Sequence, residues 1–168
     1  MQNTSLNIID IAFGDFEQEL KLTGRLLAAI PDGKLDYRPH EKSYTLGGLA
    51  HHVAELPGLV ASIVRDDEFD YATMPKVDKP ETIKDIVQIF ETSAAVARAA
   101  FAELTEEHLT RTWTFKYGGK VFFTRPKGAL LRDFFLSHMI HHRAQLTVYI
   151  RLVGGAVPGL YGPSADEM

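Results

Sequence analysis

The chain has 168 residues, of which 45% are hydrophobic and 24% are charged, a composition typical of a folded domain with one hydrophobic core. Its formal net charge is −4, and its basic residues are scattered rather than gathered in a stripe that could neutralise a phosphate backbone, so we expect no nucleic-acid partner. The chain contains no cysteine, which excludes disulfides, thiolate metal ligands and a cysteine nucleophile, and fits a cytoplasmic protein.

The N-terminal segment has acidic residues within an apolar pattern and no basic region, which is not the pattern of a signal peptide. No apolar run approaches the roughly 20 residues that a membrane-spanning helix needs, so we expect no membrane partner. No internal repeat and no linker divides the sequence. We therefore expect residues 1–168 to form a single domain.

Hydrophobic residues at three- and four-residue steps predict two long helices in the first part of the chain. The first covers residues 3–30. The second covers residues 45–66, with Thr45 as its N-cap. Pro57 lies inside the second helix and predicts a kink, because a proline there removes one backbone hydrogen bond.

The second part of the chain contains two more predicted helices, separated by a change of pattern. Residues 67–79 indicate a loop, after which a third helix opens with a proline and covers residues 80–104. Aromatic residues then alternate with polar ones and two glycines follow, which predicts a short β-hairpin or extended excursion over residues 113–124. A fourth helix begins near residue 126 or 127 and ends near residue 153, and the tail after it should be an irregular strap. These elements predict an all-α fold, a four-helix bundle with one crossover connection.

Seven histidines are present, and those outside polar connections lie on the second and fourth predicted helices. A helix turns by about 100° per residue, which gives His52 the direction of Leu49, Leu56 and other apolar residues of the second helix. His51 shares its direction with mostly polar or small residues. We therefore expect His52 to point into the core and His51 to point outward.

On the fourth helix, the same helical-wheel argument allows each of His138, His141 and His142 to point into the core, because this helix is apolar over a wide arc. Residues at i and i+4 project from one face, roughly 5–6 Å apart at Cβ, and this spacing favours His138 with His142. A pair formed by His138 and His141 stays an alternative. Gln145 and Tyr149 are candidate lining residues, although the first could be a packing position with its amide paired locally and the second a core aromatic.

Buried imidazoles that lack partners would each lose roughly 1–3 kcal/mol, and one divalent cation would satisfy three of them through a lone pair each. Neutral imidazole is the commonest metal ligand, and three histidines with an open fourth position are typical of a catalytic zinc site. Zinc and nickel both suit imidazole ligands. The alternative is that the histidines simply pack in the core with their polar atoms satisfied.

Two segments also resemble a known family. Residues 138–146 (HMIHHRAQL), together with Tyr149 and the tail at 157–167, closely resemble the C-terminal signature of the DinB family, in the DinB/YfiT-like superfamily of metalloenzymes. Residues 44–54 (YTLGGLAHHVA) resemble the helix-two motif of that family. One departure is Ala144, where many members have glycine.

This resemblance implies a four-helix bundle in up-down-down-up order, usually a homodimer, with one divalent metal ion on three histidines. Matched by position, these ligands are His52, His138 and His142. Characterised relatives in the superfamily include S-transferases and isomerases that use low-molecular-weight thiols, and many other members are described as metal-dependent hydrolases.

We therefore expect a metal-dependent enzyme that acts on a small molecule, of hydrolase or thiol S-transferase type. Zinc or nickel is the expected ion, and a bound water or a thiolate is the expected nucleophile; no general acid or base is identified. The alternative is a dimeric metal- or ligand-binding stress-response protein without turnover.

Overall fold

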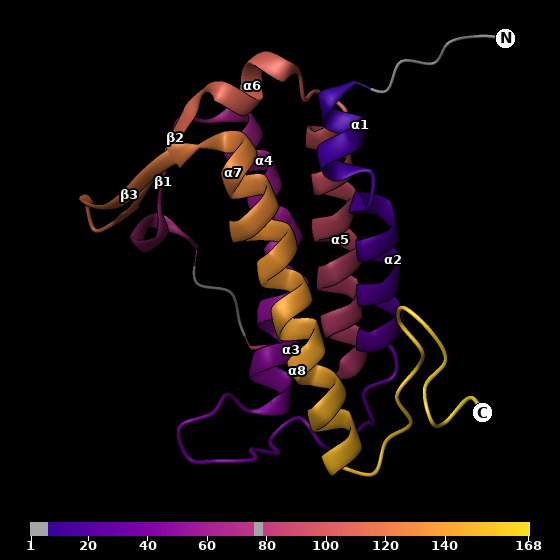
Figure 1. The fold of residues 1–168 in the computed structure, drawn as a ribbon. Helices are drawn as coiled ribbons and strands as arrows, with labels where there is room; N and C mark the ends of the chain where they lie inside the picture. Colours follow the sequence, from indigo (N-terminus) through magenta and orange to yellow (C-terminus); the bar gives the residue numbers. More distant parts are fainter. Residues whose placement is uncertain (1–6, 76–78) are drawn as a thin grey trace, which may run out of the picture.

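The computed structural model describes residues 7–75 and 79–168, so the expected start of the first helix, at residues 3–6, lies outside the described residues. The long helices run side by side, and a small sheet projects near one end of them (Figure 1). The helices are α1 (Ile8–Phe13), α2 (Phe16–Leu27), α3 (Leu46–Glu55), α4 (Leu59–Arg65), α5 (Ile83–Phe101), α6 (Glu106–Thr110), α7 (Lys127–Leu130) and α8 (His138–Leu152). Short 3₁₀ turns lie at Leu56–Gly58 (η1) and Tyr71–Thr73 (η2), and a π-helical turn lies at Leu131–Ser137 (η3).

The expectation of an all-α fold is wrong. The chain is mixed α/β, 57% helical with a three-stranded mixed sheet of β1 (Glu68–Asp70), β2 (Thr112–Tyr117) and β3 (Lys120–Pro126). β2 and β3 form the antiparallel hairpin that the aromatic alternation indicates, but β1 pairs with β2 in parallel from a segment that we expected to be a loop. Three residues are too few to show a strand's alternation, so the sequence pattern could not reveal β1.

The tip of the hairpin is fastened to the end of β1. Gly118 and Gly119 both have positive φ, 58° and 78°, as a two-residue type I′ turn requires. Their backbone N–H groups donate to the Asp70 carboxylate at 2.8 and 2.6 Å. These hydrogen bonds, with that from Gly119 first, hold the pKa of Asp70 below its usual value. The carboxylate therefore fixes where the hairpin tip lies.

Helices begin where a side chain caps the backbone, and not at every position that the sequence pattern indicates. Thr45 caps α3 as expected, because its hydroxyl accepts a backbone hydrogen bond from the first turn. At Pro57 the chain forms the 3₁₀ turn η1 between α3 and α4. The third long helix begins after Thr82, which forms a capping box with Asp85, and not at the proline that we expected to open it.

The fourth predicted helix is interrupted by the π-helical turn η3 between α7 and α8. A π-helical turn holds more residues than an α-helical turn. The direction of each side chain of α8 relative to α7 therefore differs from that on a uniform helical wheel.

A buried ion pair joins α8 to α2. Arg143 is 1% exposed and Glu19 is 3% exposed, and the guanidinium lies 2.5 Å from the Glu19 carboxylate. The guanidinium also donates to the Glu19 carbonyl at 3.0 Å and to the Thr23 hydroxyl at 3.2 Å. Tyr161 of the tail donates to the same carboxylate at 2.8 Å, and burial followed by this hydrogen bond raises the pKa of Tyr161. The tail is thus a strap over both helices.

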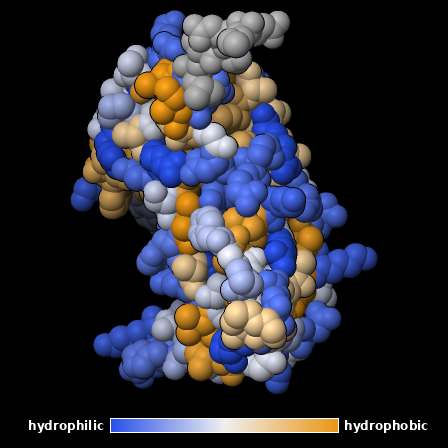
Figure 2. Space-filling model, turned by 45° about the vertical axis from the view of Figure 1, so that its right-hand side comes forward, coloured by the Kyte–Doolittle hydropathy of each residue, from blue (hydrophilic) through white to orange (hydrophobic). Residues whose placement is uncertain are grey.

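The surface of the molecule is mostly polar on the side of α2 and the tail, where hydrophobic patches are small and separate (Figure 2). Two ion pairs, Arg25 with Glu167 and Arg151 with Asp166, hold the tail there. Within residues 7–75 and 79–168, no helix combines the length and the apolar character needed to cross a membrane.

Replacing Arg143 with Leu should lower the free energy of unfolding by roughly 3–5 kcal/mol, because it leaves the Glu19 carboxylate buried without its cation. The measurement is urea denaturation followed by circular dichroism. Arg65→Ala is the matched control: Arg65 pairs with Glu103 at the surface, where water screens the ion pair, so its loss should lower the free energy of unfolding much less. Equal losses in the two variants would contradict the assignment of the buried pair.

Candidate metal centre

Three histidines from two helices meet at one point. His52 lies on α3, whereas His138 and His142 lie one turn apart on α8, and α3 packs against α8. One candidate ligand atom from each ring lies within 4.8 Å of the other two, which makes this group able to hold a metal ion. Nε2 of His52 and Nε2 of His138 are 3.3 Å apart.

The orientation of α8 explains why two of the rings face α3. Arg143 directs its guanidinium at α2, where it is buried. The preceding residue, His142, lies about 100° away around the helix and is directed at His52, with ring centroids 4.9 Å apart. His138, four residues earlier, lies on the same side of α8.

The Nδ1 atoms of His138 and His142 each face an oxygen acceptor. Nδ1 of His142 lies 2.7 Å from the Gln145 amide oxygen. Nδ1 of His138 lies 3.3 Å from the Phe134 carbonyl oxygen. Because both oxygens only accept hydrogen bonds, Nδ1 carries the proton in each ring and the Nε2 lone pair can bind a cation.

The π-helical turn η3 supplies one of these acceptors. The backbone N–H of His138 is directed at the carbonyls of Asp133 and Phe135, whereas in an α-helix it would donate to the carbonyl of Phe134, four residues back. The Phe134 carbonyl instead takes the ring Nδ1–H of His138. Single π-helical turns are common at functional sites, and here the turn orients a candidate ligand.

Tyr44 lies beside His52. The two rings are nearly parallel, with centroids 6.3 Å apart and an interplanar angle of 11°. Tyr149 donates a hydrogen bond to the Tyr44 carbonyl at 3.2 Å and packs edge-on against Tyr37. Tyr149, a candidate lining residue from the sequence, therefore supports the residue that lies beside His52.

The three rings lie at the margin of the core, each partly exposed, so His52 is less deeply buried than its apolar helical face suggests. Burial first, and then repulsion from protonated His138 and His142, lowers the pKa of His52 to about 4. Burial and the neighbouring His142 also lower the pKa of His138. Both rings are therefore neutral near pH 7, which is the form that binds a metal ion.

The remaining histidines of the two helices lie outside this group. His141 is exposed, with its ring centroid 4.9 Å from that of His142. The side chain of His51 is only 18% exposed, although the helical wheel predicts that it points outward. Its Nε2 atom lies 3.4 Å from the Glu55 carboxylate and is buried without a hydrogen bond. Both residues line a hollow beside His52.

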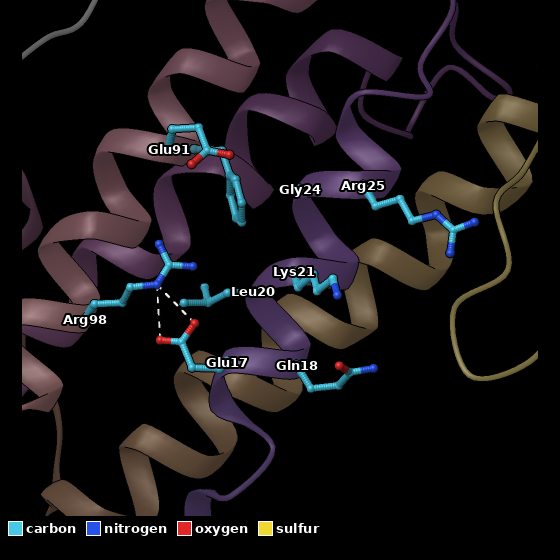
Figure 3. A pocket seen from close by; sticks show the side chains of 9 residues that line it. Glu17, Gln18, Leu20, Lys21, Gly24, Arg25, Glu91 and Arg98 are labelled. Atoms are coloured by element: carbon cyan, nitrogen blue, oxygen red, sulfur yellow. Dashed lines mark hydrogen bonds and ion pairs between the residues drawn. The ribbon is translucent and has the colours of Figure 1, made fainter.

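That hollow has a volume of about 500 Å³ and includes His52 in its wall. A different hollow, between α2 and α5, contains none of the three histidines (Figure 3). Two of its charged groups bind each other, since Arg98 donates to the Glu17 carboxylate at 3.0 Å. The hollow beside His52 is therefore the one that concerns the candidate metal centre.

Several residues around the centre carry no clear signal in the sequence. Gln145 lies three residues after His142, a spacing at which helical side chains meet, so its contact could be anticipated. The acceptor from Phe134 is a backbone carbonyl, which no side-chain pattern reveals. Tyr44 opens the segment that resembles the helix-two motif, but nothing in the sequence assigns it a role at the centre, and Glu55, which ends α3, lies just beyond that segment.

Comparisons with known proteins point to one family. The DinB family model matches residues 1–168. The chain is 29% identical over 160 residues to the uncharacterized protein YrdA of Bacillus subtilis, which covers 95% of this chain and 91% of YrdA. It is 28% identical over 141 residues to the uncharacterized protein YjoA of the same organism, which covers 83% of this chain and 86% of YjoA.

Solved structures share the fold. The crystal structure of the DinB-like protein YjoA from Bacillus subtilis superposes with a TM-score of 0.69 at 22% identity, over 89% of this chain and 96% of that one. A DinB-like protein from Bacillus cereus superposes with a TM-score of 0.68 at 23% identity, over 91% of this chain and 97% of that one. Because the family model extends over the full sequence, this chain belongs to the DinB family.

Proposed function

We propose that this chain is a metal-dependent enzyme that acts on a small molecule and holds one zinc or nickel ion between His52, His138 and His142. One observation carries the proposal: three rings bring ligand nitrogens together while oxygen acceptors hold Nδ1 of two of them. Membership of the DinB family supports a metal-binding protein. The hollow beside His52 supports a small-molecule substrate.

The chain supplies the geometry for such chemistry. A divalent ion held there would supply a Lewis acid that makes a nucleophile available near neutral pH, from water in a hydrolase or from a thiol in an S-transferase. Three protein ligands leave one coordination position for substrate or nucleophile. Gln145 and the Phe134 carbonyl orient two of the rings, and Tyr44 lies nearly parallel beside the third.

Protein purified without a polyhistidine tag should bind about one zinc or nickel ion per chain, and His52→Ala and His138→Ala should each abolish this binding, because two imidazoles hold a divalent ion much more weakly than three. Elemental analysis and calorimetric titration measure the stoichiometry. His141→Ala is the matched control, since this exposed neighbour lies outside the three-histidine group, and it should bind metal as the native chain does.

The same set of proteins tests turnover. Ester and amide substrates, and electrophiles offered together with low-molecular-weight thiols, should be converted by the metal-loaded native chain and by His141→Ala. Chelated protein and His138→Ala should be inactive. A chain that binds no metal, or one that binds metal and converts substrates equally well after chelation, would contradict the proposal.

Gln145→Leu should weaken metal binding by about 10- to 100-fold, because it removes the oxygen that orients His142. Gln145→Glu keeps an acceptor at this position and should restore most of the affinity. Competition with a chromogenic chelator measures both variants. If the affinity of Gln145→Leu equals that of the native chain, the amide does not position the ligand.

The metal-free protein should lose stability as the pH falls from 6.5 towards about 4. The folded pKa of His52 is about 4, below the ordinary value of 6.5, so in this window the unfolded chain binds a proton that the folded chain does not. The contribution of neutral His52 to the free energy of unfolding is complete above pH 6.5 and is lost as the pH falls towards about 4. Urea denaturation at several pH values should show that the free energy of unfolding falls less with falling pH in His52→Asn than in the native chain. If the free energy of unfolding depends on pH equally in the two proteins, the assignment to His52 is wrong.

A further inference from the structure

The hollow beside His52 has two different walls. One wall is formed by α3, η1 and the start of α4, with His52, Glu55 and Leu59. The other wall is formed by the turn after β1 and by the hairpin, with Tyr71, Met74 and Tyr117. Its volume of about 500 Å³ falls in the range of small-molecule sites.

The aromatic wall is held in place before any ligand arrives. The Asp70 carboxylate binds the backbone N–H groups of Gly118 and Gly119, and this ties Tyr71, which follows Asp70, to Tyr117, which precedes the glycines. The two tyrosine rings lie nearly parallel, with centroids 6.2 Å apart and an interplanar angle of 21°. Both rings are more than half exposed, at 53% and 55%, so they offer apolar faces to a ligand.

The opposite wall carries a carboxylate that is bound by no arginine or lysine in the described part of the chain. The contact that the structure gives Glu55 is Nε2 of His51 at 3.4 Å, and it makes no hydrogen bond. In contrast, most other paired carboxylates, such as Glu19 and Asp15, are bound by an arginine or a lysine. A carboxylate in a partly apolar hollow attracts an N–H donor or a cation, and aromatic faces attract a cation too.

We propose that this hollow binds a small organic amine. The ammonium group lies against Glu55, and the apolar or aromatic body of the molecule lies against Tyr71, Met74 and Tyr117, with its other end directed at His52. This inference rests on the proposed function in one respect, since it names the class of substrate for that site. The binding itself is independent of the metal ion.

The test compares two probes of the same shape and opposite charge, 2-phenylethylammonium and phenylacetate, with metal-free and zinc-loaded protein. Two-dimensional NMR titration gives both dissociation constants. We expect the amine to bind at least about tenfold more tightly than the acid, with the largest shifts at Tyr71 and Tyr117. Equal binding of the two probes, or no binding of the amine, would overturn the proposal.

Four variants assign the contacts. Glu55→Gln should remove the preference for the amine, and Tyr117→Ala should weaken the binding of both probes. Glu106→Gln removes an exposed carboxylate on α6, and Val121→Ala shortens an exposed side chain of the same hairpin outside the hollow; both should bind the probes as the native chain does. An unchanged preference in Glu55→Gln would contradict the role of this carboxylate.

The two proposals fail in distinguishable ways. If the protein binds zinc through the three histidines but does not select the amine, the substrate class is wrong and the metal centre stands. If it selects the amine but binds no metal, the hollow is a binding site and the metal-dependent function is wrong.

Discussion

The orientation of α8 depends on one ion pair that water does not reach, between Arg143 and Glu19. Burying a guanidinium is costly unless its N–H groups find acceptors, and here a carboxylate, a carbonyl and a hydroxyl all come from one side of α2. Few rotations of α8 satisfy all of them. Because two candidate ligands lie on the adjacent face of α8, the same contact that stabilises the packing also directs their rings at α3.

The sequence predicts the parts of this fold that depend on local rules. Thr45 caps a helix because its hydroxyl meets the backbone of its own first turn, and the hairpin after residue 112 follows from alternating aromatics and a glycine pair. The all-α prediction fails at β1, where pairing with β2 from more than forty positions away decides the structure. Only the neighbouring strand makes that segment extended, so its own residues carry no sign of it.

The candidate metal centre likewise has parts that the sequence predicts and parts that it does not. The spacing of His138 and His142 places both on one side of a helix, and the apolar residues around His52 direct it towards the packed side of α3. Whether the two helices are neighbours depends on packing, which a single sequence does not contain. The metal itself stays a prediction, as does the dimer. Backbone acceptors and the carboxylate in the adjoining hollow become visible only when distant segments are assembled.

The π-helical turn before His138 has a consequence for anyone who would transplant this centre into a designed protein. A straight helix carrying the same histidine spacing would use the carbonyl four residues before the first histidine for its own backbone, and that ring would be left to rotate. The extra residue in the turn frees this oxygen. A faithful graft must therefore copy the irregular backbone along with the histidines.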